Sequence, residues 1–510
     1  MRISRLFLTI SLTAFTTALL AGCEVGPDFQ SPPAPFVGNY EATPLPSSTE
    51  SSDDPSGAPQ KFLIAKDISA TWWEIFHSAP LNELIQNALK VNPDIAAAQA
   101  ALRVAQENTR ASEGALFPQL SGDFSSVRQK TSSASNNNLA PSSIYTLHTA
   151  SLNVSYGLDL FGGTRRQIEE LSAQEDYQRF ELEATYLTLT SNIVTTAIQE
   201  ASLRGQINAT NKIADEQTHQ LELVKQQFEL GGVAKSAVLL QQAALQQTKA
   251  TLPELKRQLA VLRHQLSVLG GQFPNKEPGA SFDLSSLHLP QDLPVSLPSK
   301  LVAQRPDVQE AEANLHVASA AIGVAEANRL PQIALNADIG SVATKLQKLF
   351  TPGGGLWAFG ASGTETLFDA GTLEHEEDAA KAAYDVATAQ YRKTVLTAFQ
   401  NVADALHALQ SDAETLKAQV EYEKASADSL QLAQAQFEAG ATNYLTLLIA
   451  EETEQQAKIA LVKAEAQRYS DTAALFQALG GGWWNRHQDI TQNTSPDPLD
   501  ASPVVQKEEE

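Results

Sequence analysis

The chain has 510 residues, with 36 Lys and Arg against 59 Asp and Glu, and a single cysteine. The net charge of −23 argues against a nucleic-acid-binding protein, because binding to phosphates requires a clustered basic surface. One cysteine excludes an intramolecular disulfide framework and any zinc site with several cysteines. Aromatic residues at 7% and a slightly negative mean hydropathy exclude a polytopic helical membrane protein, but not a β-barrel with alternating strands.

Residues 1–22 have the organisation of a signal peptide. Two arginines precede an uncharged, largely apolar run, Leu6–Leu20, which is too short and wrongly flanked to span a membrane as a mature helix. The run ends in small residues before Cys23, a pattern that resembles the bacterial lipobox. We therefore expect Cys23 to carry N-palmitoyl and S-diacylglycerol groups, which would anchor the protein stably. The alternative is an ordinary secretory signal followed by an unmodified thiol. Asp directly after the lipidated cysteine commonly retains lipoproteins in the inner membrane. Position 24 is Glu, which favours location in the outer membrane.

The next segment, residues 23–78, is predicted to be a lipidated N-terminal segment that contains a flexible linker. Within it, residues 42–60 are rich in Ser, Pro and Asp, a composition typical of an irregular insertion.

The body of the chain contains two copies of one plan. Five pairs of motifs recur in the same order at a nearly constant offset of about 210 residues, as expected for an internal repeat. The pairs are Asn92–Ile95 with Arg305–Val308, Leu116–Gln119 with Arg329–Gln332, Leu158–Phe161 with Glu365–Phe368, Gln227–Gly231 with Gln436–Gly440, and Leu269–Gly271 with Leu479–Gly481. We assign residues 79–270 to the first repeat and 305–480 to the second. A Pro-rich connector, residues 271–304, joins them and is expected to be irregular or extended.

Each repeat is predicted to contain a helix, two strands, a very long helix and a shorter helix. An apolar–polar alternation predicts strands with one apolar and one polar face. They lie at about 117–130 and 144–160 in the first repeat and at about 331–344 and 356–368 in the second. In the second repeat, for example, the alternating apolar positions are Ile333, Leu335, Ala337 and Ile339.

Two proline-free stretches, 163–230 and 371–438, are predicted to be continuous helices of roughly 100 Å. Shorter helices at about 236–269 and 442–479 follow them. In the second repeat, apolar residues step by alternating fours and threes, the spacing of a coiled-coil seam. These residues are Val395, Phe399, Val402, Leu406 and Leu409.

Four strands from one chain cannot close a barrel, and open edges in lipid leave unpaired backbone groups that cost several kcal/mol each. Two chains would give eight strands, a size whose interior is filled by side chains. Three chains would give about twelve strands and an aqueous lumen, while their long helices would form a hollow cylinder. The acidic excess would bias such a lumen toward cations.

Several motifs together resemble the OprM/NodT lipoprotein branch of the TolC-like outer-membrane efflux factors. They are Cys23–Phe29, Trp72-Trp73, Leu81–Ile85, Asn92–Ile95 and Arg305–Val308. The resemblance covers about residues 23–485. It implies a mainly α-helical homotrimer with a 12-stranded outer-membrane β-barrel, a periplasmic α-barrel and an equatorial belt. Residues 481–510 would then add a C-terminal equatorial piece and a disordered tail.

The resemblance also implies a function and partners. The protein would be a passive duct that carries substrates outward from a periplasmic membrane-fusion adaptor and an inner-membrane pump, most often of the proton-driven RND type. The competing interpretation is a coiled-coil lipoprotein that spaces the envelope layers without conducting; such a spacer needs no alternating strands. An envelope hydrolase is a third interpretation, which the absence of a catalytic constellation disfavours.

In this family an aromatic-x-x-Gly motif forms each helical tip and the periplasmic gate. Here the tips fall at Phe228 with Gly231 and at Phe437 with Gly440, where the glycines suit turns with positive φ.

The gate positions of this chain depart from the family pattern. A common Arg, Asp and Arg in the second repeat are replaced by Glu438, Ile449 and Glu452, and a common Asp in the first repeat is replaced by Ala237. We therefore expect an apolar constriction around Leu448 and Ile449, with Glu451 and Glu452 supplying nearby charge. The alternative is that Ile449 only packs between helices.

No motif indicates enzymatic chemistry, a cofactor or a metal. The run Glu374–Asp378 contains His375 but no second histidine at helical spacing, so a solvated helix face is the better interpretation. The glycine runs at 353–355 and 480–482 lack the lysine of a phosphate-binding loop.

Overall fold

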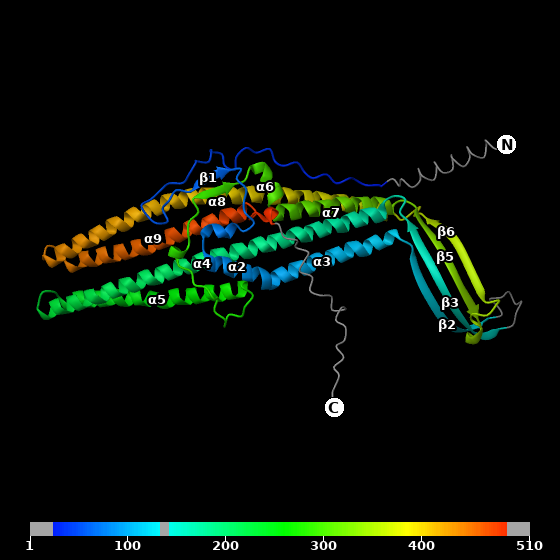
Figure 1. Cartoon of the computed structure of the whole chain (residues 1–510), viewed down its shortest axis with the longest axis horizontal. Helices are drawn as coiled ribbons and strands as arrows, with labels where there is room; N and C mark the ends of the chain where they lie inside the picture. The colour runs from blue at the N-terminus through cyan, green and yellow to red at the C-terminus, as the bar shows by residue number, and fades with distance from the viewer. Residues whose placement is uncertain (1–23, 133–141, 487–510) are drawn as a thin grey trace, which may run out of the picture.

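Long helices run from one end of the molecule to a four-stranded sheet at the other end, as Figure 1 shows. The computed structural model describes residues 24–132 and 142–486. The predicted signal peptide, Cys23 and the tail from residue 487 onward lie outside the described residues.

The two repeats have matching elements. The longest helices, α4 (Gly163–Glu229) and α8 (Thr372–Glu438), have 67 residues each, and α5 (Lys235–Leu269) and α9 (Tyr444–Ala478) have 35 each. The other α-helices of the described residues are α2 (Ala79–Val91), α3 (Pro93–Glu113), α6 (Pro298–Gln304) and α7 (Pro306–Asn328). The strands of the large sheet are β2 (Gln119–Thr131), β3 (Ser143–Leu158), β5 (Gln332–Ala343) and β6 (Gly355–Thr364).

The helices that lead into the sheet begin at corresponding prolines. Pro93 of α3 and Pro306 of α7 occupy the first helical position, where the missing N–H would have no intrahelical partner. The Asn92 side chain also accepts a hydrogen bond from the Asp94 N–H at 2.8 Å and so caps α3.

The large sheet is antiparallel, in the order β2-β3-β5-β6. The two strands of each repeat therefore stay together, and β3 of the first repeat pairs with β5 of the second. Strands β2 and β6 form the two edges.

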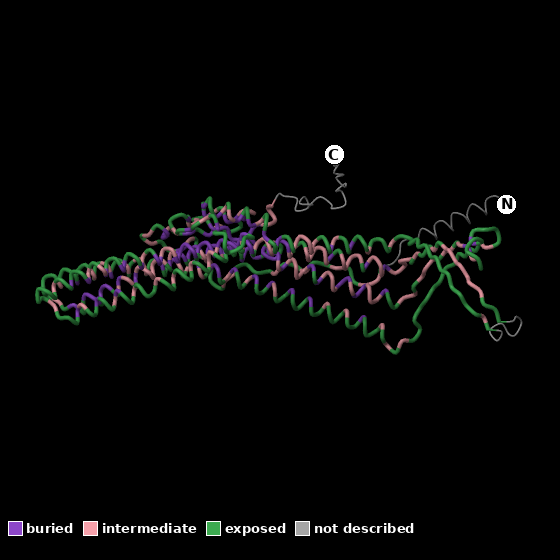
Figure 2. Tube along the Cα trace, turned by 90° about the horizontal axis from the view of Figure 1, so that it is seen from below, coloured by how far each residue is buried: buried purple, intermediate pink, exposed green. Residues whose placement is uncertain are grey.

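The main hydrophobic core lies at mid-length, as the purple residues in Figure 2 show. Trp72 and Phe76, from the short 3₁₀ helix η1 (Trp72–Phe76), are buried there, and the Trp72 ring stacks on Phe476 of α9 at 5.6 Å. Val395, Val402, Leu406 and Leu409 of the predicted seam are also buried in this core. We call this region, built from β1 (Lys61–Ile64), η1, α2, β4 (Asp292–Val295), α6 and the parts of the long helices beneath them, the equatorial belt.

The structure differs from the expected flexible insertion at residues 42–60. Thr49, Ser56 and Gln60 are buried, because the guanidinium of Arg468 in α9 donates to the backbone oxygens of Ser56, at 2.5 Å, and Ala58, at 3.2 Å. A composition rich in turn residues predicts irregular backbone. It does not indicate that Arg468, some 410 residues downstream, binds this segment.

The connector at residues 271–304, expected to be irregular or extended, is extended at β4 but also contains a helix that was not expected. This segment contains β4, which pairs in parallel with β1, and helix α6, which begins at Pro298. Prolines here mark the starts of elements, since Pro298 occupies the first position of α6.

Candidate channel and gate

The large sheet has one apolar and one polar face. Paired residues on adjacent antiparallel strands lie on the same face. The register places Ile339 opposite both Leu152 and Trp357, and Ala337 opposite Val154 and Phe359. The register therefore gathers the apolar positions on one face, which comprises Leu120, Phe124, Leu152, Val154, Tyr156, Leu158, Ile333, Leu335, Ala337, Ile339, Trp357 and Phe359.

The opposite face is polar and carries acidic groups. Asn153 of β3 pairs with Asp338 of β5, and its amide donates at 2.5 Å to the carboxylate of Asp123, a diagonal neighbour on β2. Most of the large apolar side chains on the other face are exposed. A sheet with a bare apolar face suits lipid, and its polar face suits water.

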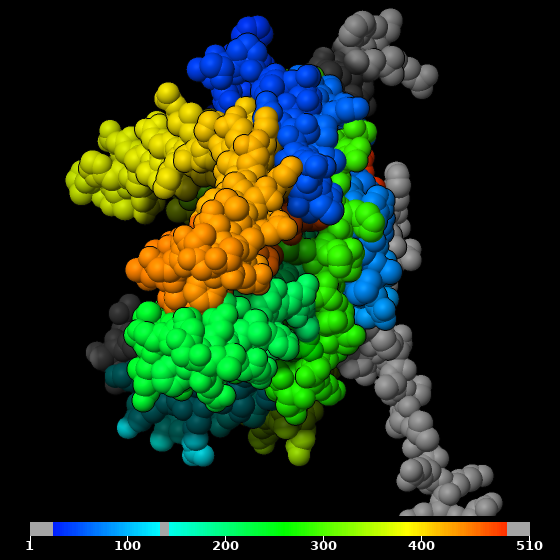
Figure 3. Space-filling model, turned by 90° about the vertical axis from the view of Figure 1, so that its left-hand side faces the viewer, coloured from blue at the N-terminus to red at the C-terminus, as the bar shows by residue number. Residues whose placement is uncertain are grey.

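The far ends of the long helices form two hairpin tips, which lie side by side in Figure 3 as the green and orange ends. The turn between α4 and α5 has Gly231 at φ +79°, and the turn between α8 and α9 has Gly440 at φ +70°. Gly232 N–H donates to the Gln227 carbonyl at 2.7 Å, and Ala441 N–H donates to that of Gln436 at 2.8 Å. The two tips therefore close by the same helix-ending geometry.

Both tips share one small hydrophobic core, the tip core. It contains Val224, Ala237, Ala433, Tyr444, Leu447, Leu448 and Ala450. Phe437 packs against it, with its ring 5.7 Å from that of Tyr444. Phe228, Gly231, Glu438, Gly440 and Glu452 are exposed at the tip surface.

The two residues expected to share a constriction lie in different environments. Leu448 is 7% exposed and belongs to the tip core, whereas Ile449 is 55% exposed. Of the two, only the Ile449 side chain is available to a neighbouring subunit or to a lumen. Ala237 is buried in the tip core and does not line a surface.

A polar link across the tips was not predicted from the sequence. The Tyr444 hydroxyl of α9 donates to the Gln241 side chain of α5, and Gln241 is fully buried. Nearby, Lys458 of α9 lies 3.9 Å from Glu216 of α4. These links join residues some 200 to 240 positions apart, and a single Tyr or Gln in a Gln-rich helix gives no sequence signal for them.

Glu451 is buried next to this link. Burial raises its pKa to about 7, a hydrogen bond from Gln241 opposes the rise, and Glu216, Glu452 and Glu454 add repulsion. Its Oε2 has no hydrogen-bond partner among the described residues. The charged form is therefore poorly accommodated in the packed tip.

We expect the packed tip to become more stable as the pH falls. The carboxyl of Glu451 keeps its proton to a higher pH in the packed tip than when it is exposed, so packing gains stability as pH falls through 7 toward 4.5. Between pH 8 and pH 5.5 the gain should be about 2 kcal/mol. Hydrogen exchange of residues 444–456, corrected for intrinsic rates, should show it.

The Glu451→Gln variant should lose this pH dependence, while Glu452→Gln, at an exposed neighbouring position, should retain it. The same pH dependence in Glu451→Gln and the wild type would contradict the assignment to Glu451.

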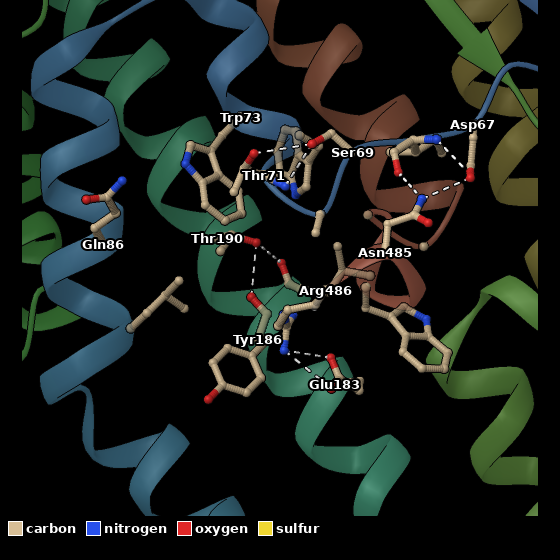
Figure 4. Close-up of a pocket in the computed structure, with 18 of the residues that line it drawn as sticks. Asp67, Ser69, Thr71, Trp73, Gln86, Glu183, Tyr186, Thr190, Asn485 and Arg486 are labelled. Carbon is tan, nitrogen blue, oxygen red and sulfur yellow. Dashed lines mark hydrogen bonds and ion pairs between the residues drawn. The ribbon is translucent and has the colours of Figure 1, made fainter. Parts of the chain in front are cut away.

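A pocket of about 1010 Å³ lies in the equatorial belt, between η1, α2, α4 and the segment after α9 (Figure 4). Its wall includes the buried Glu183, which pairs with Arg486 at 3.0 Å, while the Arg486 guanidinium lies 4.4 Å from the Tyr186 ring centroid. Asn485 and Trp484 each donate to Asp67 at 3.0 Å. These contacts fix the C-terminal end of the described chain to the belt.

In residues 24–132 and 142–486, no group of three or more His, Cys, Asp or Glu is placed to hold a metal ion; in the run around His375, Glu377 pairs instead with Arg329 and Lys381. Within the same residues, no helix has the length and apolarity to cross a bilayer.

Comparison with known proteins gives concordant matches. A family model described as outer membrane efflux protein matches residues 84–272 and 297–481, one segment in each repeat. The chain is 30% identical over 491 residues to the probable efflux pump outer membrane protein TtgC of Pseudomonas putida, covering 96% of this chain and 98% of that protein. It is also 30% identical to the pyoverdine export outer membrane protein OpmQ of Pseudomonas aeruginosa, covering 82% and 89% of the two chains.

Solved structures agree. The outer-membrane channel OprN superposes with a TM-score of 0.80 at 27% identity, covering 90% of this chain and all of that one. The outer membrane protein VceC of Vibrio cholerae has a TM-score of 0.77 at 26% identity, covering 82% of this chain and all of that one.

Proposed function

The chain belongs to the outer membrane efflux protein family and is an outer-membrane channel component of an efflux system, and from this premise we propose that three copies form one continuous duct. The observation that carries the proposal is the four-stranded sheet with two open edges, one apolar face and one polar face. Edge strand β6 of one copy would pair with β2 of the next, so that three sheets of four strands close a 12-stranded barrel. The apolar face would meet lipid and the polar face would line water.

The helices support the same arrangement. Each copy has two long hairpins, and the exposed apolar side chains of Val386 and Leu396 on α8 offer contacts to a neighbouring copy. Helices of 67 residues are roughly 100 Å long, which suits a duct that reaches deep into the periplasm. Lipid groups on Cys23 would add an anchor in the outer membrane.

The duct would be passive and would act with partners. A periplasmic adaptor would dock at the hairpin tips, and an inner-membrane pump, of the RND type, would supply the energy. The second candidate, a non-conducting spacer, has no use for a sheet with opposite polar and apolar faces.

We propose that Ile449 lines the narrowest part of the closed tip, because its side chain is exposed while the neighbouring Leu448 is buried. In planar bilayers the purified wild-type protein should conduct ions, with a preference for cations. Ile449→Asp should place three carboxylates in the constriction and raise the cation-to-anion permeability ratio several-fold, since charged rings set selectivity in pores.

Val261→Asp is the matched control, because Val261 is similarly exposed but lies in α5 far from the hairpin turn, so its substitution should leave selectivity unchanged. Unchanged conductance and selectivity in Ile449→Asp would reject the constriction role alone. A wild-type protein that never conducts would reject the duct.

A further inference from the structure

The motif Glu24–Phe29, at the start of the described chain, is bound to the body of the protein. At its centre is Arg166 of α4, which is only 3% exposed although it carries a permanent charge. Arg166 donates from Nε to the Val25 carbonyl at 3.0 Å and from Nη2 to the Gly26 carbonyl at 3.3 Å. The same guanidinium pairs with Asp28 at 2.8 Å. One buried side chain therefore holds the backbone and a side chain of the N-terminal peptide.

The peptide lies against glycines, where the backbones approach closely. Gly26 has φ +91°, and a Cβ atom built there would lie 2.3 Å from the Cα of Gly323 in α7. A Cβ on Gly162, which precedes α4, would lie 2.7 Å from the side chain of Glu24. Neither position has room for a side chain, so the fit depends on bare backbone.

The last residue of the peptide also has a specific partner. The Phe29 ring stacks on the His316 ring of α7, with 4.3 Å between the centroids and 11° between the planes. His316 in turn lies 2.8 Å from Glu169, which also pairs with Arg166. Burial tends to raise the pKa of Glu169, but hydrogen bonds from Arg166 and His316 hold it below its usual value.

These contacts occur at the junction of the sheet and the helices. The Val25 N–H donates to the carbonyl of Phe161 at 3.1 Å, just after β3 ends at Leu158 and before α4 begins at Gly163. The residue before the bound peptide is Cys23.

We propose that Glu24–Phe29 is a docking peptide and that Gly162, Arg166, Glu169, His316 and Gly323 form its docking site, which fixes the entry point of the N-terminal anchor at the sheet–helix junction. Docking stands on the contacts themselves, whereas the position of a lipid rests on the proposed modification of Cys23. Arg166 acts here as a positioning residue. The chain that follows the docking peptide is held at the equatorial belt, where Arg468 donates to the Ser56 carbonyl. The N-terminal segment therefore connects the sheet end of each subunit to its mid-length.

Gly26→Val in the full-length protein tests the docking without altering Arg166. The added side chain clashes with Gly323 and disfavours the positive φ, so the peptide should detach. Hydrogen exchange of residues 25–29 should rise at least tenfold, because the Val25 N–H loses its partner. Gly38→Val is the matched control, since a Cβ there meets nothing within 4 Å, and exchange should stay unchanged.

Arg166→Gln should also speed exchange of residues 25–29, with Arg179→Gln, at a half-exposed arginine on the same helix, as its control. Unaltered exchange in Gly26→Val overturns the docking site, even if Arg166→Gln proves unable to fold. Mass spectrometry and bilayer conductance on the same samples separate the causes: a missing lipid or a missing conductance with normal docking contradicts the proposed function and leaves the docking site intact.

Discussion

Ile339→Arg is expected to abolish assembly of the proposed membrane-inserted trimer. Ile339 is 63% exposed on the single subunit and lies opposite Leu152 and Trp357 on the apolar face of the sheet. If this face were in contact with water, an arginine there would hardly change the stability, because the side chain at position 339 is mostly exposed. On the lipid-facing side of a barrel, arginine near the bilayer midplane costs about 2–4 kcal/mol per copy, or roughly 6–12 kcal/mol for three copies. The amount of heat-resistant trimer recovered from outer membranes measures the effect.

Asn336→Arg is the matched control. Asn336 lies on the same strand, three residues away, and its pairing with Ser155 and Gly360 places it on the polar face. The same substitution there should leave the trimer intact and weaken cation preference. Equal loss of trimer in both variants, or in neither, would contradict the assignment of the two faces.

Arg468→Ala is expected to release the N-terminal segment from the equatorial belt. Arg468 is 1% exposed, and its guanidinium binds the Ser56 and Ala58 carbonyls and, at 3.3 Å, the Gln60 side chain. Alanine would leave buried acceptors unpaired and a cavity behind, which together cost about 3–5 kcal/mol. Hydrogen exchange of residues 49–60 should rise by roughly 10²- to 4 × 10³-fold, since 1.4 kcal/mol corresponds to a factor of ten.

Loss of Arg468 should also change the protonation of the nearby Asp412. Burial raises the pKa of Asp412 to about 8. A hydrogen bond with Asp471 and the repulsion between the two carboxyls also raise this pKa, whereas the charge of Arg468 lowers it. Without Arg468, the pKa of Asp412 should rise further. Arg257→Ala, at an exposed arginine paired with Glu254 in α5, should change neither the exchange nor the belt. Unchanged exchange of residues 49–60 in Arg468→Ala would show that other contacts hold the segment.

The strands and long helices could be predicted from the sequence because their periodicities are local properties. Alternation at Ile333, Leu335, Ala337 and Ile339 predicts the apolar face that the register assembles from all four strands. The family and the channel function follow from motifs that are contiguous in the chain, and the comparisons confirm both.

Helix geometry alone separates the two residues of the predicted constriction. Consecutive residues of an α-helix point about 100° apart. Leu448 and Ile449 are consecutive in α9, so one enters the tip core while the other is exposed. Apolar composition alone groups Leu448 with Ile449, whereas the helical period directs their side chains to different sides of α9.

The contacts that fix the belt, the tips and the N-terminal peptide could not be predicted. Arg468 binds residues about 410 positions away, and the Tyr444–Gln241 link spans 203 positions. The motif Cys23–Phe29 carries a family resemblance, but Arg166, the partner of Glu24–Phe29, is one of several arginines without a distinguishing pattern. Such long-range polar pairs depend on tertiary packing, and the local sequence around each residue does not indicate them.

The number of subunits around a water-filled bore tests the central claim most directly. Electron cryomicroscopy of the purified full-length protein in lipid nanodiscs would count the strands and follow the interior. The proposed function predicts three copies, a closed barrel in which β6 of each copy pairs with β2 of the next, and a passage from the barrel into the helical cylinder. A single subunit, or a trimer whose sheets do not join around a lumen, would contradict it.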